Sequence, residues 1–515
     1  MTELATVVTF LAVLGGTSLL AVTARRFRPG PELPTLTGWA LADRRLGGPM
    51  TWFLLGGTIY TAYTFAAVPG LVYGVGALGF FALPYTVVVC PLAFVLLPRL
   101  WSVARRHGYV TVAVFVRGRY GSPSLALVVA LTGILATLPY VALQVLGIRA
   151  VLAAGGLYPQ GLAGDVALVA VFAVLAVATF RHGLRAPAVI SLVKGTAIFC
   201  SVLAVVFVVL DRLGGPGPMF RDAERALVAG GVPQVSLVLD PNLYGAFATL
   251  ALGSALALLM YPHVLTVAFA ASGPEALRRA SIALPAWTAV LGLFGLLGVA
   301  ALAIGVAAPP GNAEAAVPLL VRELMPTALT GLVFGALAVG ALVPAAVMSI
   351  AAATSFVRNV YVEYFRPTAT PKHQMRVAQM VSLTAKVFAV VFVFGLRNQD
   401  AINLQLLGGV WILQTVPAVA VGLFTRWLHH RALLAGWGVG MVAGTFMVVQ
   451  GGFSPVVGVA LAGWQIQAYA GLAALALNLL VAVVLTPLLD RAGAVRGPDL
   501  TELSDSGNDP SGGSR

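Results

Sequence analysis

Long apolar runs recur from one end of the chain to the other, separated by short polar stretches. A helix needs roughly 20 consecutive apolar residues to cross the hydrocarbon core of a bilayer. The runs lack the strict apolar–polar alternation of transmembrane strands, which disfavours a barrel. The pattern predicts an all-α polytopic membrane protein with about 13 transmembrane helices. Their expected limits are 4–24, 50–71, 77–97, 122–152, 163–180, 187–210, 243–267, 280–306, 327–357, 378–396, 402–424, 432–451 and 465–488.

The composition agrees with this class. Hydrophobic residues make up 59% of the chain and charged residues only 10%, against about 25% charged residues in soluble proteins. A net charge of +13 would suggest a nucleic-acid partner in a soluble chain, but here the basic residues collect in alternate short loops. We therefore expect the lipid bilayer, and no nucleic acid, as a partner. Cys90 and Cys200 both lie in apolar runs, which argues against a disulfide framework or a metal site.

The distribution of arginine and lysine among the loops predicts the orientation. Loops after odd-numbered runs are rich in arginine, as at Arg105, Arg106, Arg278 and Arg279, whereas loops after even-numbered runs carry few basic residues. Positively charged loops tend to stay in the cytoplasm. We expect a multi-pass plasma-membrane protein with its N-terminus outside and its C-terminus in the cytoplasm, which requires an odd number of spans. The first run is expected to stay as an uncleaved anchor.

Two lysines, Lys194 and Lys386, lie inside apolar runs that contain no carboxylate to pair with them. A charged side chain near the bilayer centre costs about 2.5–3.5 kcal/mol on insertion scales, so each lysine marks a candidate functional site. Each must bind an anion, lose its proton or extend its ammonium group to the membrane surface. For Lys386 the last alternative is favoured, because its run is expected at the edge of the bundle.

The second apolar run has the features of a helix that is broken at a binding site. Gly56 and Gly57 are expected to unwind it, and Pro69-Gly70 to break it again. Transporters bind substrates where unwound backbone exposes carbonyl groups and half-helix ends. The alternative is a glycine-rich packing face, but dense hydroxyl groups favour the functional interpretation. These come from Thr58, Tyr60, Thr61, Tyr63 and Thr64.

Three other runs carry polar residues that we consider for the site. Gln144 lies one turn from Tyr140 in the fourth run, where substrate binding and a helix–helix hydrogen bond are equally plausible. Ser349 lies about one turn from the Ala346 carbonyl in the ninth run, and such oxygens can hold sodium, although small residues there favour packing. The eleventh run contains a candidate gate or substrate-facing wall near Gly408-Gly409, formed by Gln405, Trp411 and Gln414.

Other chemistry is not supported by the sequence. His263, in Tyr261-Pro262-His263, is expected at the membrane interface at the end of the seventh run. The chain has no His/Cys/Glu cluster of metal-ligand spacing, no P-loop and no GxSxG motif. Acidic residues are confined to loops, the tail and the ends of runs, which disfavours a carboxylate-based proton relay. We therefore expect no enzymatic activity and no cofactor.

The segments MYPHVLTVAFAASGPEALRRASIALPAW, PAAVMSIAAATSFVRNVY and LQLLGGVWILQTVPAVAVGLFTRW resemble the solute/sodium symporter family. They are most similar to its bacterial monocarboxylate permease branch. The resemblance implies a LeuT-like core of 5+5 helices in two inverted repeats, here runs two to six and seven to eleven. The expected organisation is a first helix and loop (1–49), the transport core (50–424), two peripheral helices (425–490) and a disordered cytoplasmic tail (491–515).

The resemblance also implies a sodium site, formed by backbone carbonyls of the first core helix and by oxygens of the eighth. Matching the motifs places it at Gly57, Tyr60, Ala346 and Ser349. The chain departs from the family pattern in three places, one of which is the loop motif after GYVT, where the usual acidic residue is missing. Ile350 stands where the family has a second hydroxyl. Ser191 stands where many members have an aspartate, and Lys194 follows one turn later. We hypothesise that Lys194 replaces sodium by cycling its proton or helps to attract a carboxylate; the alternative is that it extends to the cytoplasmic surface.

The resulting prediction is a secondary active symporter that imports a small monocarboxylate such as pyruvate, lactate, acetate or propionate. Alternating access would be coupled to Na⁺ or H⁺. Another small solute, such as an amino acid, a sugar or urea, remains an alternative. A channel or a sensor is less favoured, because the tail is too short for an output domain. The residues expected to bind the substrate are Gly56, Thr58, Thr61, Gln144, Gln405, Trp411 and Gln414.

Overall fold

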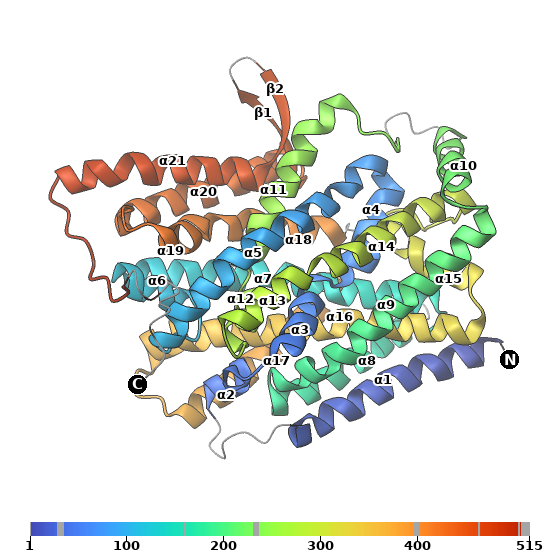
Figure 1. Ribbon diagram of the computed structural model, residues 1–515, viewed down its shortest axis with the longest axis horizontal. Helices are drawn as coiled ribbons and strands as arrows, with labels where there is room; N and C mark the ends of the chain where they lie inside the picture. Colours follow the sequence, from blue (N-terminus) through green and yellow to red (C-terminus); the bar gives the residue numbers. More distant parts are fainter. Residues whose placement is uncertain are drawn as a thin grey trace.

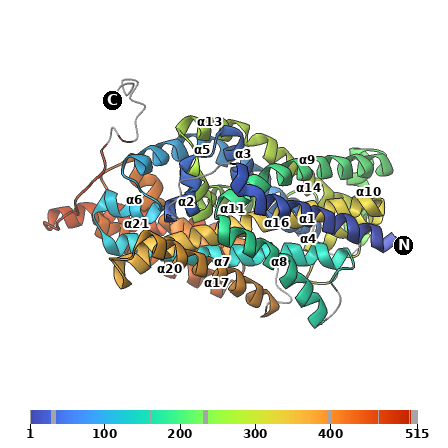
Figure 2. The same cartoon turned by 90° about the horizontal axis from the view of Figure 1, so that it is seen from below.

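The computed structural model describes residues 2–27, 35–158, 161–229, 236–395, 401–461, 464–502 and 505. Long helices run side by side, mostly along the longest axis of the molecule (Figure 1), and the same bundle is seen from below in Figure 2. Within the described ranges, ten helical segments are long and apolar enough to cross a membrane. Two shorter apolar stretches lie within the first and eighth helices. The helical, polytopic class predicted from the sequence is confirmed.

The N-terminal half of the described chain contains a first helix, five predicted spans and short connecting helices. Its elements are α1 (Thr2–Phe27), α2 (Leu36–Leu41), η1 (Ala42–Arg44), α3 (Gly48–Ile59), η2 (Tyr63–Ala67), α4 (Val68–Val75), η3 (Gly76–Phe81), α5 (Ala82–Arg106), α6 (Val112–Tyr120), α7 (Pro123–Ala154), α8 (Leu162–His182), α9 (Arg185–Leu213) and α10 (Pro216–Ala229). The second predicted span, 50–71, consists of α3, η2 and the start of α4.

The following elements complete the core. They are η4 (Pro241–Leu243), α11 (Tyr244–Met260), α12 (Pro262–Ala270), α13 (Pro274–Ala283), α14 (Pro285–Ile304), η5 (Ala313–Ala315), α15 (Ala316–Leu324), α16 (Thr327–Phe356), η6 (Val357–Phe365), α17 (Pro371–Gly395), α18 (Ala401–Ile412), η7 (Leu413–Thr415), η8 (Pro417–Val421) and α19 (Gly422–Phe424). The predicted seventh span, 243–267, is divided between α11 and α12.

The chain ends in two long helices that lie on one side of the core, α20 (His430–Gln450) and α21 (Ala470–Arg491). They pack on each other and on α18. An antiparallel hairpin of β1 (Val456–Leu461) and β2 (Trp464–Tyr469) joins them, with Val456 opposite Tyr469. The sequence prediction began the last helix at residue 465 and was wrong there, because residues 464–469 pair with residues 456–461 as antiparallel strands. The Tyr469 N–H then bonds Thr249 of α11 at 2.9 Å.

Helix α16 forms the centre of the packing, because every residue of its most apolar stretch is buried. It contacts α1, α7, α9 and α17. The glycines of α16 let neighbouring helices come close to its backbone. A Cβ at Gly331 would lie 2.0 Å from the Thr9 hydroxyl, and one at Gly335 would lie 2.6 Å from Val13. Small residues in a membrane helix thus let its neighbours pack backbone to backbone.

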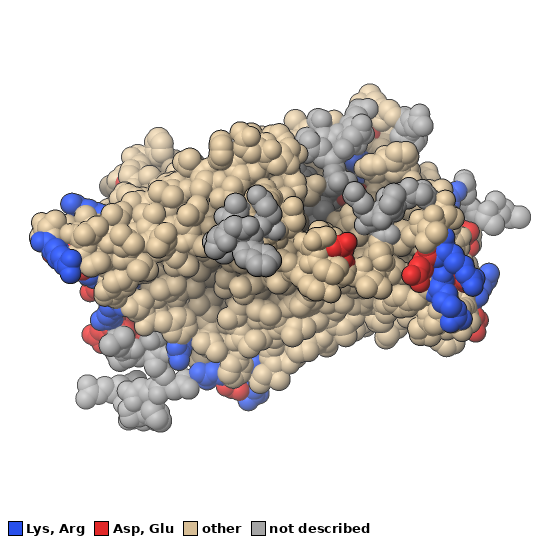
Figure 3. Space-filling view, turned by 90° about the horizontal axis from the view of Figure 1, so that it is seen from above, with Lys and Arg blue, Asp and Glu red and all other residues tan. Residues whose placement is uncertain are grey.

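Most charged side chains on the face shown in Figure 3 lie toward its two ends, and the broad middle is largely uncharged. Helices α6 and α19 lie at the left end of Figure 1, and α10 lies at the opposite end. This distribution is the one expected of a protein with a lipid-facing belt. Which end of the bundle faces the cytoplasm stays a prediction from the loop charges.

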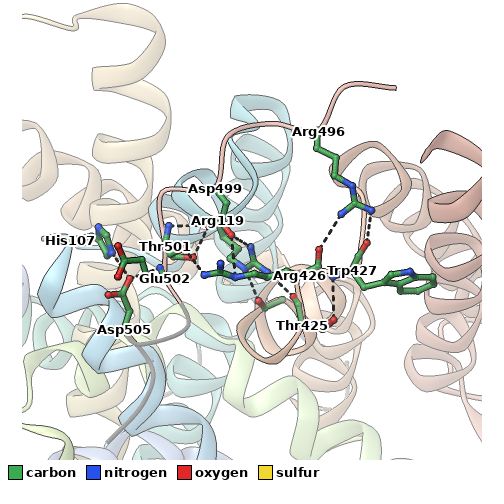
Figure 4. A network of polar contacts seen from close by, with 11 residues as sticks. His107, Arg119, Thr425, Arg426, Trp427, Arg496, Asp499, Thr501, Glu502 and Asp505 are labelled. Carbon is green, nitrogen blue, oxygen red and sulfur yellow. Dashed lines mark hydrogen bonds and ion pairs between the residues drawn. The ribbon is translucent and has the colours of Figure 1, made fainter. Parts of the chain in front are cut away.

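The expected disorder of the tail is wrong for residues 492–502 and 505; residues 503–504 and 506–515 lie outside the described part. Asp499 forms ion pairs with Arg119 of α6 and with Arg426 after α19 (Figure 4). Asp505 forms an ion pair with Arg106 at 2.6 Å, and its Oδ2 lies 2.7 Å from the His107 Nε2. The acidic residues of the short polar tail thus pair with basic residues at the end of the bundle. A local sequence pattern does not predict these long-range contacts.

Removing the Asp499 carboxylate tests how much this docked segment stabilises the protein. The Arg119 side chain is 7% exposed and would retain only backbone acceptors in Asp499→Ala. We expect the free energy of unfolding to fall by about 1–3 kcal/mol, because a buried donor loses its partner. Asp222→Ala, which breaks an exposed pair with Arg225, is the control and should have little effect. Equal thermal unfolding midpoints of the two variants in detergent would contradict this expectation.

Candidate functional site

Two membrane-spanning helices are broken in the core. Helix α3 ends at Ile59, Tyr60 is extended with φ −94° and ψ 97°, and helical structure resumes at η2. Helix α11 ends at Met260, Tyr261 is extended with φ −61° and ψ 132°, and α12 begins at Pro262. Each break falls in the first helix of one half of the core, as expected for an inverted repeat. The sequence prediction included the first break but not the second.

The first break lies after the glycine pair and not at it. Gly56 is helical, and its missing side chain admits Trp287: a Cβ there would lie 2.1 Å from the Trp287 Nε1. Pro69-Gly70 does not break the chain again, because α4 continues to Val75. A Cβ at Gly70 would lie 2.9 Å from backbone atoms of Ala313. Both expectations of unwinding at glycine were therefore wrong; these glycines permit close packing.

The carbonyl groups freed by the break bind Lys194. Its Nζ donates to the Gly57 carbonyl at 2.5 Å and to the Tyr60 carbonyl at 3.2 Å. An unbroken helix would use these oxygens for N–H groups four residues later, but the Thr64 N–H bonds Thr61 instead, at 2.8 Å. Lys194 is 1% exposed. The alternative in which its ammonium extends to the surface therefore does not hold, and neither backbone partner carries a charge.

Gln144 of α7 binds the other side of the same break. Its Oε1 accepts from the Ala62 N–H at 3.0 Å. Its Nε2 donates to the Tyr140 carbonyl at 3.1 Å and contacts the Thr61 hydroxyl at 3.4 Å. The break therefore has a side-chain acceptor for a freed N–H and an ammonium donor for freed carbonyls. Gln144 supports the broken backbone directly, which explains an amide in an otherwise apolar part of α7.

Ser349 belongs to a second buried network, which reaches Lys386. The Lys386 Nζ donates to the Ser382 hydroxyl at 2.9 Å, and Ser382 donates to Ser349 at 3.1 Å. Ser349 in turn donates to the Ala346 carbonyl at 2.8 Å. Lys386 is 2% exposed, so the expectation that it extends to the surface was wrong. The adjacent Ile350 is buried and offers no oxygen from its side chain.

A buried polar cluster surrounds the second break and comprises Tyr140, Tyr261, His263 and Gln405. The Tyr140 ring lies 5.2 Å from that of Tyr261 and 5.3 Å from that of His263. The Tyr261 hydroxyl donates to the Gln405 carbonyl at 3.3 Å. The Tyr140 hydroxyl also lies near Thr61, without hydrogen-bond geometry. The cluster therefore joins α7, the α11–α12 break and α18, and it reaches toward the first break.

Several polar atoms of this cluster have no hydrogen-bond partner within the described residues: both ring nitrogens of His263, the Tyr140 hydroxyl and the Gln405 Oε1. The Tyr63 hydroxyl, on η2, shares this property. A buried polar group without a partner costs about 1–3 kcal/mol. Hydroxyl and imidazole N–H groups are donors that suit the oxygens of a carboxylate. The cluster therefore places unused hydrogen-bonding groups between the two halves of the core.

His263 is the residue of this cluster that the sequence prediction misplaced. It is 0% exposed and lies at the start of α12, inside the bundle. The sequence did contain a signal for this break, namely a proline within an apolar run that is followed directly by a titratable side chain. Proline fits the first position of a helix, and here Pro262 marks the start of a second half-helix and not the end of the span.

Some predicted site residues have contacts elsewhere. The Trp411 Nε1 donates to Thr445 of α20 at 3.1 Å. The Gln414 Nε2 donates to the Val410 carbonyl at 2.9 Å, and its Oε1 accepts from Asn478 of α21 at 3.2 Å. These two side chains tie the core to the C-terminal helices, so we leave them out of the proposed site. Thr58 is buried, and its hydroxyl donates to the Leu55 carbonyl of its own helix at 2.9 Å.

Comparison with known proteins gives concordant matches. Residues 39–444 match the model of the sodium:solute symporter family. A protein of Rhizobium johnstonii named monocarboxylate transport permease protein is 46% identical over 479 residues, which cover 93% of this chain and 96% of the relative. The uncharacterized symporter YodF of Bacillus subtilis is 31% identical over 478 residues, covering 91% of this chain and 92% of the relative.

Solved structures share the fold at low sequence identity. A Na⁺-coupled sialic acid symporter in a substrate-bound, outward-open state superposes with a TM-score of 0.74 at 14% identity, covering 94% of this chain and 98% of the other. The inward-facing conformation of Mhp1 gives a TM-score of 0.50 at 16% identity, covering 90% and 94%. The predicted core of two inverted repeats is confirmed. The family model and the relatives show that this chain is a multi-pass membrane transporter that belongs to the sodium:solute symporter family.

Proposed function

We propose that this protein imports a small monocarboxylate, such as pyruvate, lactate, acetate or propionate, by alternating access. The observation that carries the proposal is the buried Lys194 side chain, whose Nζ donates to the Gly57 carbonyl at the first helix break. A buried cation with only neutral partners favours binding of an anion, because a charge in an apolar interior is costly until it is compensated. The name of the 46% identical relative supports the same class of substrate.

The carboxylate would bind between the two breaks. Tyr140 and His263 supply donors from opposite halves of the core, and Gln405 supplies an amide. Gln144 and Thr61 would act indirectly, by holding the first break in the form that presents Lys194. A solute bound to half-helices of both repeats is placed where rocking of one repeat against the other exposes it to each side in turn.

We further propose that the proton on Lys194 is the coupled cation. Family membership supports sodium, but the donor set at the expected sodium position argues against it. The Gly57 and Tyr60 carbonyls already accept from Lys194, and Ile350 adds no oxygen. Two unit charges about 4 Å apart repel by about 4 kcal/mol at an effective dielectric constant near 20. A sodium ion beside the charged lysine would face this repulsion.

In this scheme protonation and substrate binding support each other. A proton taken up by the Lys194 amine gives the ammonium that bonds both carbonyls and attracts the carboxylate. Release of the substrate removes the compensating charge and favours loss of the proton. Because linkage is reciprocal, substrate must favour protonation as much as protonation favours substrate.

The coupling is tested by uptake of radiolabelled pyruvate into proteoliposomes, with sodium and pH gradients imposed separately. We expect an inward proton gradient to drive uptake, and Lys194→Ala to abolish or decouple it while the protein remains in the membrane. Ser349→Ala should weaken any sodium dependence of the parent. Sodium-driven uptake that persists in Lys194→Ala, with unchanged pH dependence, would refute the role of the lysine while leaving symport intact.

The binding site is tested by shortening its donors one at a time. Tyr140→Phe and His263→Ala should each raise the KM for the transported acid by about tenfold, because a hydrogen bond to a charged group contributes about 1.5–3 kcal/mol. Tyr244→Phe changes an exposed tyrosine on α11 and serves as the control. Unchanged KM values in the cluster variants would remove these residues from the site.

The class of substrate is tested by competition. Unlabelled propionate, lactate and acetate should inhibit pyruvate uptake, whereas glucose, urea and neutral amino acids should not. The reason is that a buried ammonium favours a net negative solute over a neutral or zwitterionic one. Strong inhibition by a neutral solute, with weak inhibition by the acids, would contradict the monocarboxylate assignment.

A further inference from the structure

A second polar recess lies away from the transport site, where α6, the start of α7 and η6 meet. It is a small, open cavity of about 90 Å³. Arg117, Arg358, Asn359 and Glu363 contribute its polar wall. These residues belong to the end of the bundle that carries the arginine-rich loops, which the loop charges predict to be cytoplasmic. None of them contributes to the two helix breaks.

The charges in this cavity are unbalanced. Arg117 pairs with Glu363, so one positive and one negative charge cancel. Arg358 remains, and the hydrogen bond that its Nη1 makes within the described ranges is to the neutral amide of Gln374, at 3.4 Å. Its Nε is buried and has no partner among the residues that the structure describes. Asn359 is already bonded to Thr111. The cavity therefore presents one uncompensated guanidinium group.

The other wall of the cavity is apolar and continues onto the surface of α7. Leu127 lines the cavity, and Leu131 and Leu135 follow at intervals of four residues, with exposures of 45% and 41%. Residues four apart lie on one face of a helix. The three leucines therefore form a stripe roughly 12 Å long at 1.5 Å per residue. The stripe leads from the guanidinium group along the membrane-facing side of the bundle.

We propose that this cavity binds an anionic phospholipid of the leaflet at the arginine-rich end. The headgroup phosphate lies against Arg358, whose planar guanidinium matches phosphate oxygens. One acyl chain runs along Leu127, Leu131 and Leu135. A soluble phosphate would satisfy the charge but not the apolar stripe, which is why a lipid is the assigned occupant. The proposal does not depend on the transported substrate.

The test uses the full-length protein in detergent, with phosphatidylglycerol, phosphatidylcholine or inorganic phosphate added. We expect phosphatidylglycerol to raise the thermal unfolding midpoint in a saturable way, because a ligand that binds the folded state stabilises it. Phosphatidylcholine and inorganic phosphate should have little effect. An equal effect of inorganic phosphate, or of phosphatidylcholine, would overturn the assignment of an anionic lipid.

Matched variants locate the effect. Arg358→Gln should weaken binding of phosphatidylglycerol about fivefold, since one basic group near an anionic surface contributes about 1 kcal/mol. Arg105→Gln removes the same charge from an exposed position on α5 and should bind like the parent. Glu363→Gln should bind more tightly by a similar factor, because it frees Arg117. Native mass spectrometry of retained lipid gives a second readout.

The variants also separate binding from folding. If Arg358→Gln does not fold, the tighter binding expected of Glu363→Gln still tests the proposal. Equal lipid affinity of the parent, Arg358→Gln and Glu363→Gln would overturn it.

Discussion

A charged group in an apolar bundle needs polar partners that are not already used by other hydrogen bonds. This constraint determines the arrangement at the centre of the molecule. Lys194 is buried, and its partners are the Gly57 and Tyr60 carbonyls. Such carbonyls are available only where a helix stops bonding to itself. The lysine and the broken helix therefore depend on each other, and Gln144 completes the arrangement by accepting from the Ala62 N–H. Removing the lysine, the helix break or Gln144 would leave a buried polar group without a hydrogen-bond partner.

The packing around α16 makes this arrangement possible. Alanine and glycine residues let α1, α7, α9 and α17 approach one helix closely. That proximity brings side chains from distant parts of the sequence to the same place. Lys386 thereby reaches the Ala346 carbonyl through Ser382 and Ser349. Both oxygens expected from α16 for a cation are thus already engaged in hydrogen bonds, as are the two carbonyls of the broken helix.

At the ends of the bundle, in contrast to its centre, charged side chains pair with each other. Asp499 and Asp505 bind basic groups of α5, α6 and the segment after α19 (Figure 4). The contacts with Arg119 and His107 join segments that are separated by hundreds of residues. Arg358 differs from these paired groups, because the one acidic residue that lines its cavity is Glu363, which pairs with Arg117. Trp411 and Gln414 attach the two C-terminal helices to the core.

The sequence by itself determined the spans, since the length and apolar character of each run follow from the thickness of the bilayer. It also identified the two lysines as anomalies, because a charge in an apolar run is costly wherever the helix packs. Only the tertiary structure decided what those charges touch, that Tyr261 breaks a second helix, and that His263 is buried beside Tyr140. The contacts of the tail were likewise decided by the tertiary structure and not by the local sequence. These features depend on contacts between residues far apart in the chain, whereas a run of apolar residues is a local property.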